Sequence, residues 1–249
     1  MKKKDRDYME ITTSIRKRII NTIYQAGVGH VGGSLSAVEI LTALYFEVLK
    51  LNPEDPKWKG RDIFILSKGH AASALYAVLV ERGLLKSEKE LIGTFGRINS
   101  RFQVHPDGHK IEWVEISSGS LGQGLSIGVG AALGAKLSSL PNRAYVLLGD
   151  GECQEGQVWE AAMSASQYDL DNLVAIIDCN KAQLSGSVEE VLSIEPLAEK
   201  WRSFGWQVKA VDGHNLEELL TAFHEASATT GRPTVILANT LKGKGVSFM

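Results

Sequence analysis

Short apolar runs alternate along the chain with stretches in which apolar residues recur every three or four positions. The runs AYVLL at 144–148 and LVAII at 173–177 predict strands buried on both faces of a sheet, the second extending to 178. Further strands are predicted at 62–66, 207–211 and 234–239. Helices are predicted at 8–26, 37–49, 71–83, 122–137, 156–168, near 196–203 and at 216–228. This alternation predicts an α/β, doubly wound, mostly parallel sheet with helices on both faces.

Residues with capping chemistry mark several of these helix ends. Gly27 follows the last periodic position of the first helix and is expected to end it. Ser36, with Glu39 three residues later, predicts a capped start for the helix at 37–49. Asn215, with Glu218 at the equivalent position, predicts the start of the helix at 216–228.

The chain shows no linker, low-complexity segment or internal repeat. Residues 86–115 have no sustained period and are expected to form an extended functional loop. We therefore predict one domain over 1–249, with the N-terminal helices of 8–50 packed on it.

Composition indicates an ordinary globular protein. The chain has 249 residues, 44% hydrophobic and 22% charged, with a formal net charge of −2. That balance gives no indication of a nucleic-acid or membrane partner. No signal peptide is expected after the basic residues 1–5, and no apolar run approaches the roughly 20 residues that a spanning helix needs. Cys153 and Cys179 have no metal or redox spacing, which indicates a reducing cytoplasm.

Asp150 and Asn180 each follow a predicted strand, and ligands of open α/β sheets bind beyond such strand ends. Residues 152–179 are enough for one helix and one strand, which would return the chain to a neighbouring strand end. A carboxylate, an amide oxygen and a backbone carbonyl near Ala182 suit Mg²⁺ and a phosphate-bearing cofactor. The alternative is that Gly149-Asp150-Gly151 is only a turn after a strand.

Glycines precede and pattern the helix predicted at 122–137. The segment 119–124 (GSLGQG) lets the backbone approach a ligand and offers N–H groups at a helix start. Repeated glycines within the helix imply that another backbone packs very close. A tightly packed helix start with no ligand is the alternative.

Three histidines lie near glycines, prolines or strand ends: His30, His70 and His105. A single histidine is more often structural, but His70 follows a predicted strand as Asp150 does. The remaining histidines, His109, His214 and His224, are expected to have structural or surface roles.

Charged residues flank the same motifs. Glu152, Glu155 and Glu160 either complement a helix dipole or lie near a cofactor or a neighbouring subunit. Lys242 and Lys244 follow the last predicted strand and would bring ammonium groups near phosphate, although a solvated tail is equally consistent for Lys244.

Taken together, these segments resemble the cofactor-binding half of thiamine-diphosphate enzymes, and transketolases in particular. The matching segments run in the same order along nearly the whole chain. They are GHVGGSLS around His30, SKGHAASALYA around His70, the His105 loop, GSLGQGLS, GDGECQEGQVWEA, IDCNKAQLSG and LKGKG. Dehydrogenase and decarboxylase relatives share mainly the Gly-Asp-Gly and Asn element.

The resemblance implies a role for each matching position. The Mg²⁺ ligands would be Asp150, Asn180 and the Ala182 carbonyl, with Ca²⁺ or Mn²⁺ as substitutes. Residues expected to contact thiamine diphosphate are Lys68, His70, Gly119, Ser120, Leu121, Gly151, Glu152, Asn180 and Lys242. Catalytic roles are expected for His30, His70, His105 and Glu155. Glu155, Glu160 and the small-residue helix would lie at an interface between subunits.

The resemblance also implies a missing partner. Single-chain transketolases continue into a second domain whose glutamate activates the cofactor ring, and no such domain follows within 249 residues. The chain therefore resembles the N-terminal subunit of a split transketolase, expected to join a C-terminal subunit in a heterotetramer with two copies of each. Family members usually continue past the equivalent of Met249 to one more active-site histidine.

The implied reaction is transfer of a two-carbon ketol unit from a ketose phosphate to an aldose phosphate. Alternatives keep the cofactor and change the acceptor, as in deoxyxylulose-phosphate synthase or in two-carbon transfer to modified sugars or a carrier. A non-catalytic assembly subunit of the same fold is the third interpretation.

Overall fold

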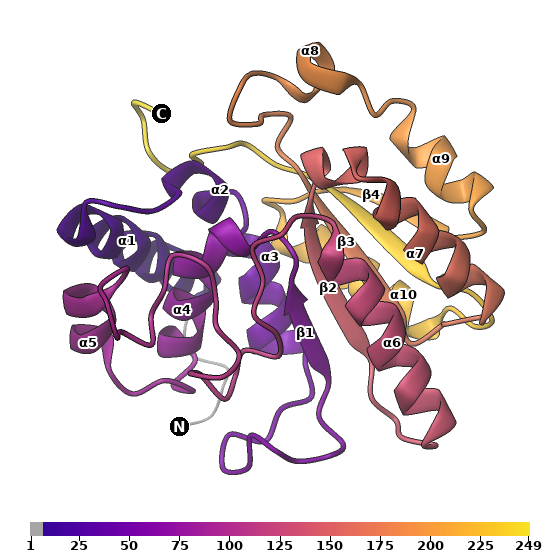
Figure 1. The fold of residues 1–249 in the computed structure, drawn as a ribbon, viewed down its shortest axis with the longest axis horizontal. Helices are drawn as coiled ribbons and strands as arrows, with labels where there is room; N and C mark the ends of the chain where they lie inside the picture. The colour runs from indigo at the N-terminus through magenta and orange to yellow at the C-terminus, as the bar shows by residue number, and fades with distance from the viewer. Residues whose placement is uncertain (1–6) are drawn as a thin grey trace.

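The computed structural model describes residues 7–249, so the basic residues 1–5 lie outside the described part. Its centre is a parallel five-stranded sheet in the order β1-β2-β3-β5-β4 (Figure 1). The strands are β1 (Ile63–Leu66), β2 (Ala144–Gly149), β3 (Leu173–Cys179), β4 (Gln207–Asp212) and β5 (Thr234–Asn239). The predicted α/β fold class and parallel sheet are confirmed, and the strand bounds differ by at most one residue.

Helices cover both faces of the sheet because successive strand residues point to opposite sides. In β2, Tyr145 and Leu147 join one buried cluster, and Val146 and Leu148 join the other. The first cluster includes helices α1 (Tyr8–Ala26), α3 (Val38–Ala43), α4 (Ala72–Glu81) and α10 (Leu216–Ala228). The second includes α6 (Gln123–Leu137), α7 (Gly156–Gln167) and α9 (Leu197–Ser203), which lie together on one side in Figure 1.

The predicted end of α1 and the predicted start of α10 are confirmed. Gly27 adopts a left-handed conformation with φ of 67° and ends α1. Asn215 begins α10, and its side chain accepts hydrogen bonds from the N–H groups of Glu217 at 3.1 Å and Glu218 at 3.3 Å. The Glu218 carboxylate accepts from the Asp212 N–H and the Asn215 side-chain amide instead of returning to the Asn215 backbone.

The helix predicted at 37–49 is found at 38–48, but its predicted Ser36 cap and its continuity as one α-helix are wrong. A short helix α2 (Val31–Leu35) leads almost directly into α3, followed by a π-helical turn at Leu44–Val48. Ser36 does not cap α3: it is the C-cap of α2, with its N–H bonded to the Gly32 carbonyl, and its hydroxyl donates to Asp178 at 2.6 Å. The backbone of Ala37 forms the start of α3 with no side-chain cap.

Besides α2, two further short helices were not predicted. Helix α5 (Glu88–Thr94) interrupts the segment 86–115, whose remainder is irregular, and Ser87 caps it. Helix α8 (Val188–Leu192) begins at Ser187, which forms a reciprocal cap with Glu190. Each helix is only one to two turns long, so it carries too few apolar positions to show a period. The Ser187 and Glu190 spacing is the sequence signal that could have located α8.

Close packing against the sheet explains part of the glycine pattern in α6. A Cβ on Gly124 would collide with the Ser67 side chain, and one on Gly128 would collide with a Val146 methyl group. Gly130 and Gly134 have open space around the same position. The prediction of close backbone packing is therefore confirmed at Gly124, where the Ser67 Cα is also near, whereas Gly128 meets only side chains. Gly130 and Gly134 have no neighbour among the described residues.

Candidate functional site

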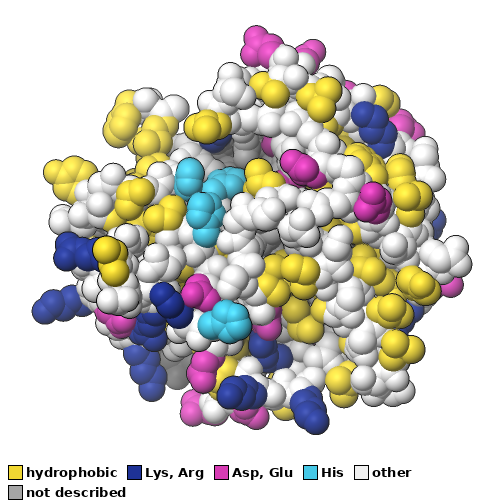
Figure 2. Space-filling view, in the orientation of Figure 1, with side chains coloured by type: hydrophobic (Ala, Val, Ile, Leu, Met, Phe, Trp, Pro, Cys, Tyr) yellow, Lys and Arg dark blue, Asp and Glu magenta, His cyan; other side chains and the backbone are white. Residues whose placement is uncertain are grey.

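The candidate site lies at the carboxyl edge of the sheet. Gly149 pairs with Asp178 across β2 and β3, so Asp150 and Asn180 leave adjacent strands at the same edge. His70 follows β1, and Lys242 follows β5. All four line one cavity of about 520 Å³. Figure 2 shows histidine side chains gathered beside a hollow in this face.

Asp150 is a buried carboxylate whose two oxygens are oriented by backbone groups. It is 5% exposed, and it accepts hydrogen bonds from the N–H groups of Gly151 at 2.8 Å and Lys181 at 2.6 Å. Burial raises the pKa of Asp150 above its usual value, although these two hydrogen bonds oppose the shift. Each oxygen keeps a further lone pair. A cation beside Asp150 would favour the ionised carboxylate.

The turn after β3 presents two further oxygens to the cavity. Lys181 has a φ of 61°, a left-handed conformation uncommon for a residue other than glycine. The Asn180 side-chain oxygen accepts from the Ala182 N–H at 3.2 Å, and its amide nitrogen donates to Asp178 at 3.3 Å. The Ala182 carbonyl accepts from the Lys242 ammonium at 3.0 Å. Asn180, Ala182 and Lys242 thus meet at one wall of the cavity.

A fully buried Asp178 connects the segments that surround this wall. Its carboxylate forms an ion pair with Lys68, and it accepts from the hydroxyls of Ser36 and Thr240. Burial alone would raise the pKa of Asp178, but the Lys68 charge and these hydrogen bonds lower it. The Lys68 ammonium, predicted to contact the cofactor, is thus held by Asp178. Sequence reasoning missed Asp178, whose only signal was a charged residue ending an apolar strand.

Glu152 ties the loop before α6 to the Gly-Asp-Gly turn. It is 2% exposed, and its carboxylate accepts from the Ser67 hydroxyl at 2.6 Å and the N–H groups of Gly122 at 2.8 Å and Gly149 at 2.7 Å. Three protein donors therefore use the carboxylate that was predicted to contact the cofactor. Its geometry is that of a positioning residue at the cavity wall.

The substitution Glu152→Gln is expected to lower the free energy of unfolding by about 1–3 kcal/mol. A glutamine amide would point N–H groups at one of the backbone donors, leaving a buried donor without an acceptor. Chemical denaturation of both proteins measures the difference. Equal stability would show that the carboxylate does not hold these segments together.

The three predicted histidines come together. The His30 ring centroid lies 5.6 Å from that of His70 and 5.9 Å from that of His105. Burial, followed by the positive charge of Lys68, lowers the pKa of His70 from 6.5 to about 3. Burial and the nearby charges of His105 and Lys242 also lower the pKa of His30. His70 is therefore neutral near pH 7, so one of its ring nitrogens can donate a hydrogen bond and the other can accept one.

Glycines let the histidines and loops approach so closely. A Cβ on Gly33 would lie 2.9 Å from the His70 Nε2 atom. A Cβ on Gly69 would lie 2.8 Å from the Gly119 backbone nitrogen, so only glycine lets the loop before α6 rest on the end of β1. Gly119 itself has a φ of 155° and packs on the His105 ring.

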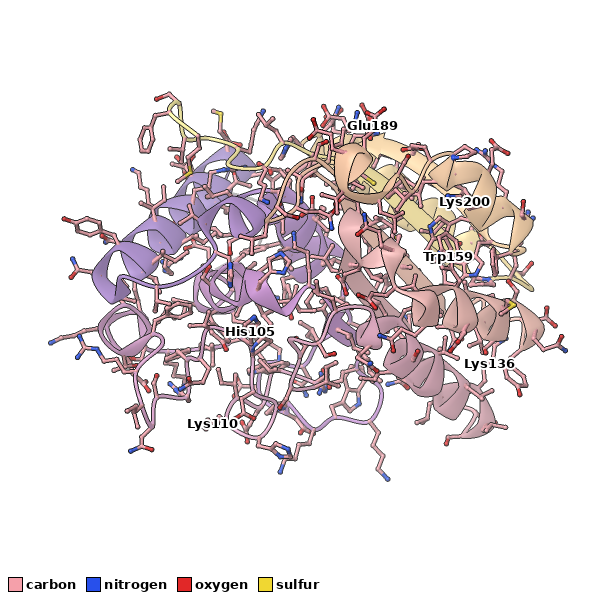
Figure 3. All side chains as sticks on the ribbon, turned by 45° about the horizontal axis from the view of Figure 1, so that its top comes forward. His105, Lys110, Lys136, Trp159, Glu189 and Lys200 are labelled. Atoms are coloured by element: carbon pink, nitrogen blue, oxygen red, sulfur yellow. The ribbon has the colours of Figure 1, made fainter. Side chains whose placement is uncertain are left out.

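The remaining predicted residues divide between the cavity and the surface. Gly119, Leu121 and Gly151 line the cavity, whereas the Ser120 side chain is exposed. Glu155 and Glu160 are exposed on α7 and its start, outside the cavity. Figure 3 labels His105 near the middle of the molecule, away from Trp159 on α7. A catalytic role for Glu155 would therefore require a second subunit.

The family model described as "Transketolase, thiamine diphosphate binding domain" matches residues 8–248. The chain belongs to this transketolase domain family. Two relatives are themselves named as parts of larger transketolases. The 6-deoxy-6-sulfo-D-fructose transketolase subunit SqwG of Clostridium sp. (strain MSTE9) is 47% identical over 94% of this chain and 84% of its own length. One subunit of the apulose-4-phosphate transketolase of Phocaeicola vulgatus is 44% identical over 94% of this chain and 82% of its own length.

Solved transketolases share the fold of this chain. The Pichia stipitis transketolase complexed with sedoheptulose 7-phosphate superposes with a TM-score of 0.91 at 32% identity. The match covers 96% of this chain but 36% of that one. The Leishmania mexicana transketolase superposes with a TM-score of 0.92 at 31% identity, covering 97% of this chain and 38% of that one. The chain thus spans little more than a third of these transketolases.

The donor set fits a magnesium diphosphate better than a metal held by protein alone. Within residues 7–249, no three or more His, Cys, Asp or Glu side chains form a group that could hold a metal ion. Asp150 supplies one carboxylate, and Asn180 and Ala182 supply neutral oxygens. Mg²⁺ prefers such oxygen ligands together with phosphate oxygens and water. The residues present therefore fit an ion that shares its ligands with the cofactor diphosphate.

Proposed function

We propose that this chain is the diphosphate-binding subunit of a two-subunit transketolase, which transfers a two-carbon ketol unit between sugar phosphates. The observation that supports it most strongly is the arrangement of the cavity. His30, His70 and His105 line the same cavity as Asp150 and Asn180. A subunit that served only assembly and catalysed no reaction would have no physical need to keep both the histidines and the Asp150 and Asn180 pair.

Each group has a chemical task in this proposal. When bound, thiamine diphosphate supplies the nucleophilic carbon and the electron sink for breaking and forming a carbon–carbon bond beside a carbonyl. Asp150, Asn180 and the Ala182 carbonyl would hold Mg²⁺, and Lys242 would offset the remaining phosphate charge. The neutral imidazoles of His30 and His70 donate or accept hydrogen bonds at sugar hydroxyls and carry protons between them.

A separate C-terminal subunit is the partner that we infer, in a heterotetramer with two copies of each chain. The surface around the cavity supports this: Leu184, on its rim, is fully exposed. On α6, Ile127 is 40% exposed and the outward Gly130 and Gly134 leave room for another backbone. Contiguous exposed apolar patches mark protein interfaces, and these residues are candidates for such a patch. Glu155 and Glu160 would face the partner across this surface.

Modified ketoses are candidate donor sugars for this subunit. The relatives' names point to a sulfonated ketose and to apulose 4-phosphate, so modified ketoses belong beside ordinary ketose phosphates among the candidates. The test is a donor panel with the assembled subunits, magnesium and thiamine diphosphate, followed by detection of the shortened aldose. Release of a shortened aldose supports ketol transfer. Cofactor binding without cleavage of any donor would contradict the proposal.

We expect His30→Ala to slow transfer by about 100-fold or more while cofactor affinity stays nearly unchanged. His30 lines the cavity with His70 and His105, so its loss removes a hydrogen-bonding and proton-carrying group. His109→Ala is the matched control, because His109 is exposed and outside the cavity. Equal losses of rate and cofactor affinity in His30→Ala would argue against a role at the substrate.

No helix of residues 7–249 is both long and apolar enough to cross a membrane.

Cys153 and Cys179 are free and buried, and burial raises the pKa of both thiols. Inert buried thiols are consistent with the predicted cytoplasmic location, which stays a prediction.

A further inference from the structure

The C-terminal segment after β5 carries Lys242 to the cavity. We call residues 240–249 the strap. In Figure 1 the strap leaves the sheet and passes close to α2 before reaching the C-terminus. The Gly243 N–H donates to the Gly32 carbonyl at 3.2 Å, and a Cβ on Gly32 would lie 2.9 Å from the Lys242 side chain. The position of the Lys242 ammonium therefore depends on how the strap is anchored.

One anchor is His214, in the loop between β4 and α10. Its Nε2 accepts a hydrogen bond from the Leu241 N–H at 2.8 Å, and its Nδ1 lies 2.9 Å from a Glu39 carboxylate oxygen. A backbone N–H can only donate, so Nε2 carries the lone pair and Nδ1 carries the proton. His214 thus links Leu241 to Glu39 as a neutral imidazole. Its side chain is 11% exposed, so of the two roles expected for it, structural or surface, it has the structural one.

A second anchor reaches the strap from α1. The Arg16 guanidinium bonds to both oxygens of Glu39 through one nitrogen, at 2.7 and 2.8 Å. Its Nε donates to the Lys244 carbonyl at 3.0 Å. Burial alone would raise the pKa of Glu39, but the His214 hydrogen bond and the Arg16 charge lower it. His214 and Arg16, which contact the strap before and after Lys242, are therefore both bound to the Glu39 carboxylate.

We infer that His214 and Arg16, both bonded to Glu39, are positioning residues that hold Lys242 at the diphosphate end of the cavity. The inference rests on the proposed function, because it requires a cofactor diphosphate beside Lys242. None of the three side chains lines the cavity. Their effect on the cofactor passes through Leu241, one position before Lys242, and Lys244, two positions after it.

The test is a double-mutant cycle between His214 and Lys242 in the assembled two-subunit complex. The measurement is the dissociation constant of thiamine diphosphate at fixed Mg²⁺. His214→Phe keeps a ring but removes both hydrogen bonds, and we expect it to weaken binding about 5- to 10-fold. In a Lys242→Met background the same change should cause no further loss. His214→Gln, whose amide oxygen can still accept from the Leu241 N–H, should restore much of the affinity.

The control is His224→Phe, which changes an exposed histidine on α10 and should leave the affinity unchanged. If His214→Phe is too unstable to assay, Arg16→Gln removes the contact with Lys244 instead. Its effect on thiamine diphosphate affinity is then compared with and without the Lys242 ammonium. Equal losses with and without the Lys242 ammonium would overturn the inference, because they would indicate a general structural effect. So would unchanged affinity in His214→Phe. A wild-type complex that binds no cofactor would instead refute the proposed function.

Discussion

Replacing Asp150 by alanine is expected to abolish the Mg²⁺-dependent binding of thiamine diphosphate while leaving the fold intact. Asp150 is the carboxylate that faces the proposed cation, and the other proposed ligands are a neutral amide and a carbonyl. Loss of a residue that only orients a metal ligand commonly costs 10- to 100-fold in affinity, so loss of the ligand itself should cost at least about 100-fold. Titration of the assembled complex with thiamine diphosphate, with and without Mg²⁺, measures this effect.

The matched control is Asp55→Ala. Asp55 is an exposed carboxylate in the loop before β1, away from the carboxyl edge of the sheet. The Asp55→Ala protein should bind the cofactor as the unchanged protein does. If Asp150→Ala kept the same affinity and the same dependence on Mg²⁺, Asp150 would not be a metal ligand, and Gly149-Asp150-Gly151 would be only a turn after β2.

The second large effect is expected at the buried ion pair of Lys68 and Asp178. Both side chains are fully buried, so removing one partner leaves a charge without compensation. We expect Lys68→Met to lower the free energy of unfolding by about 3–5 kcal/mol. Asp178 also loses a donor while Ser36 and Thr240 remain, which leaves the carboxylate partly satisfied. Denaturant unfolding of the chain gives the value.

The double variant Lys68→Met/Asp178→Asn separates the charge from the packing. It removes both charges and keeps an amide that can bond to the Ser36 and Thr240 hydroxyls. We expect it to be more stable than Lys68→Met alone. A double variant as unstable as the sum of the two single variants would mean that the pair contributes no specific interaction.

Local patterns were sufficient to predict the sheet and the residues that follow its strands. Apolar runs identified β2 and β3 almost to the residue, and the parallel order then brought Asp150 and Asn180 to one edge. This was possible because parallel strands present their carboxyl ends together. The histidines were recognised by their motifs, and the structure adds that their rings are neighbours.

Contacts between distant segments could not be predicted from local patterns. Ser36 matched a capping signal, yet its hydroxyl bonds to Asp178, 142 positions along the chain. His214 precedes the Asn215 cap in the sequence, yet its ring accepts a hydrogen bond from the Leu241 N–H, 27 positions along the chain. Glu152 matched the motif of a cofactor contact, while its carboxylate holds three segments of the fold. In each case the side chain bonds to a residue that is distant in the sequence but close at the carboxyl edge of the sheet.

The most direct test of the proposed function is reconstitution of ketol transfer. This chain would be assayed alone and together with a separate C-terminal transketolase subunit. Both samples contain Mg²⁺, thiamine diphosphate, ribose 5-phosphate as acceptor, and a donor panel that includes xylulose 5-phosphate and modified ketoses. We predict transfer in the mixture and almost none from this chain alone. Equal activity without the second subunit, or no transfer from any donor in a mixture that binds the cofactor, would contradict a split transketolase.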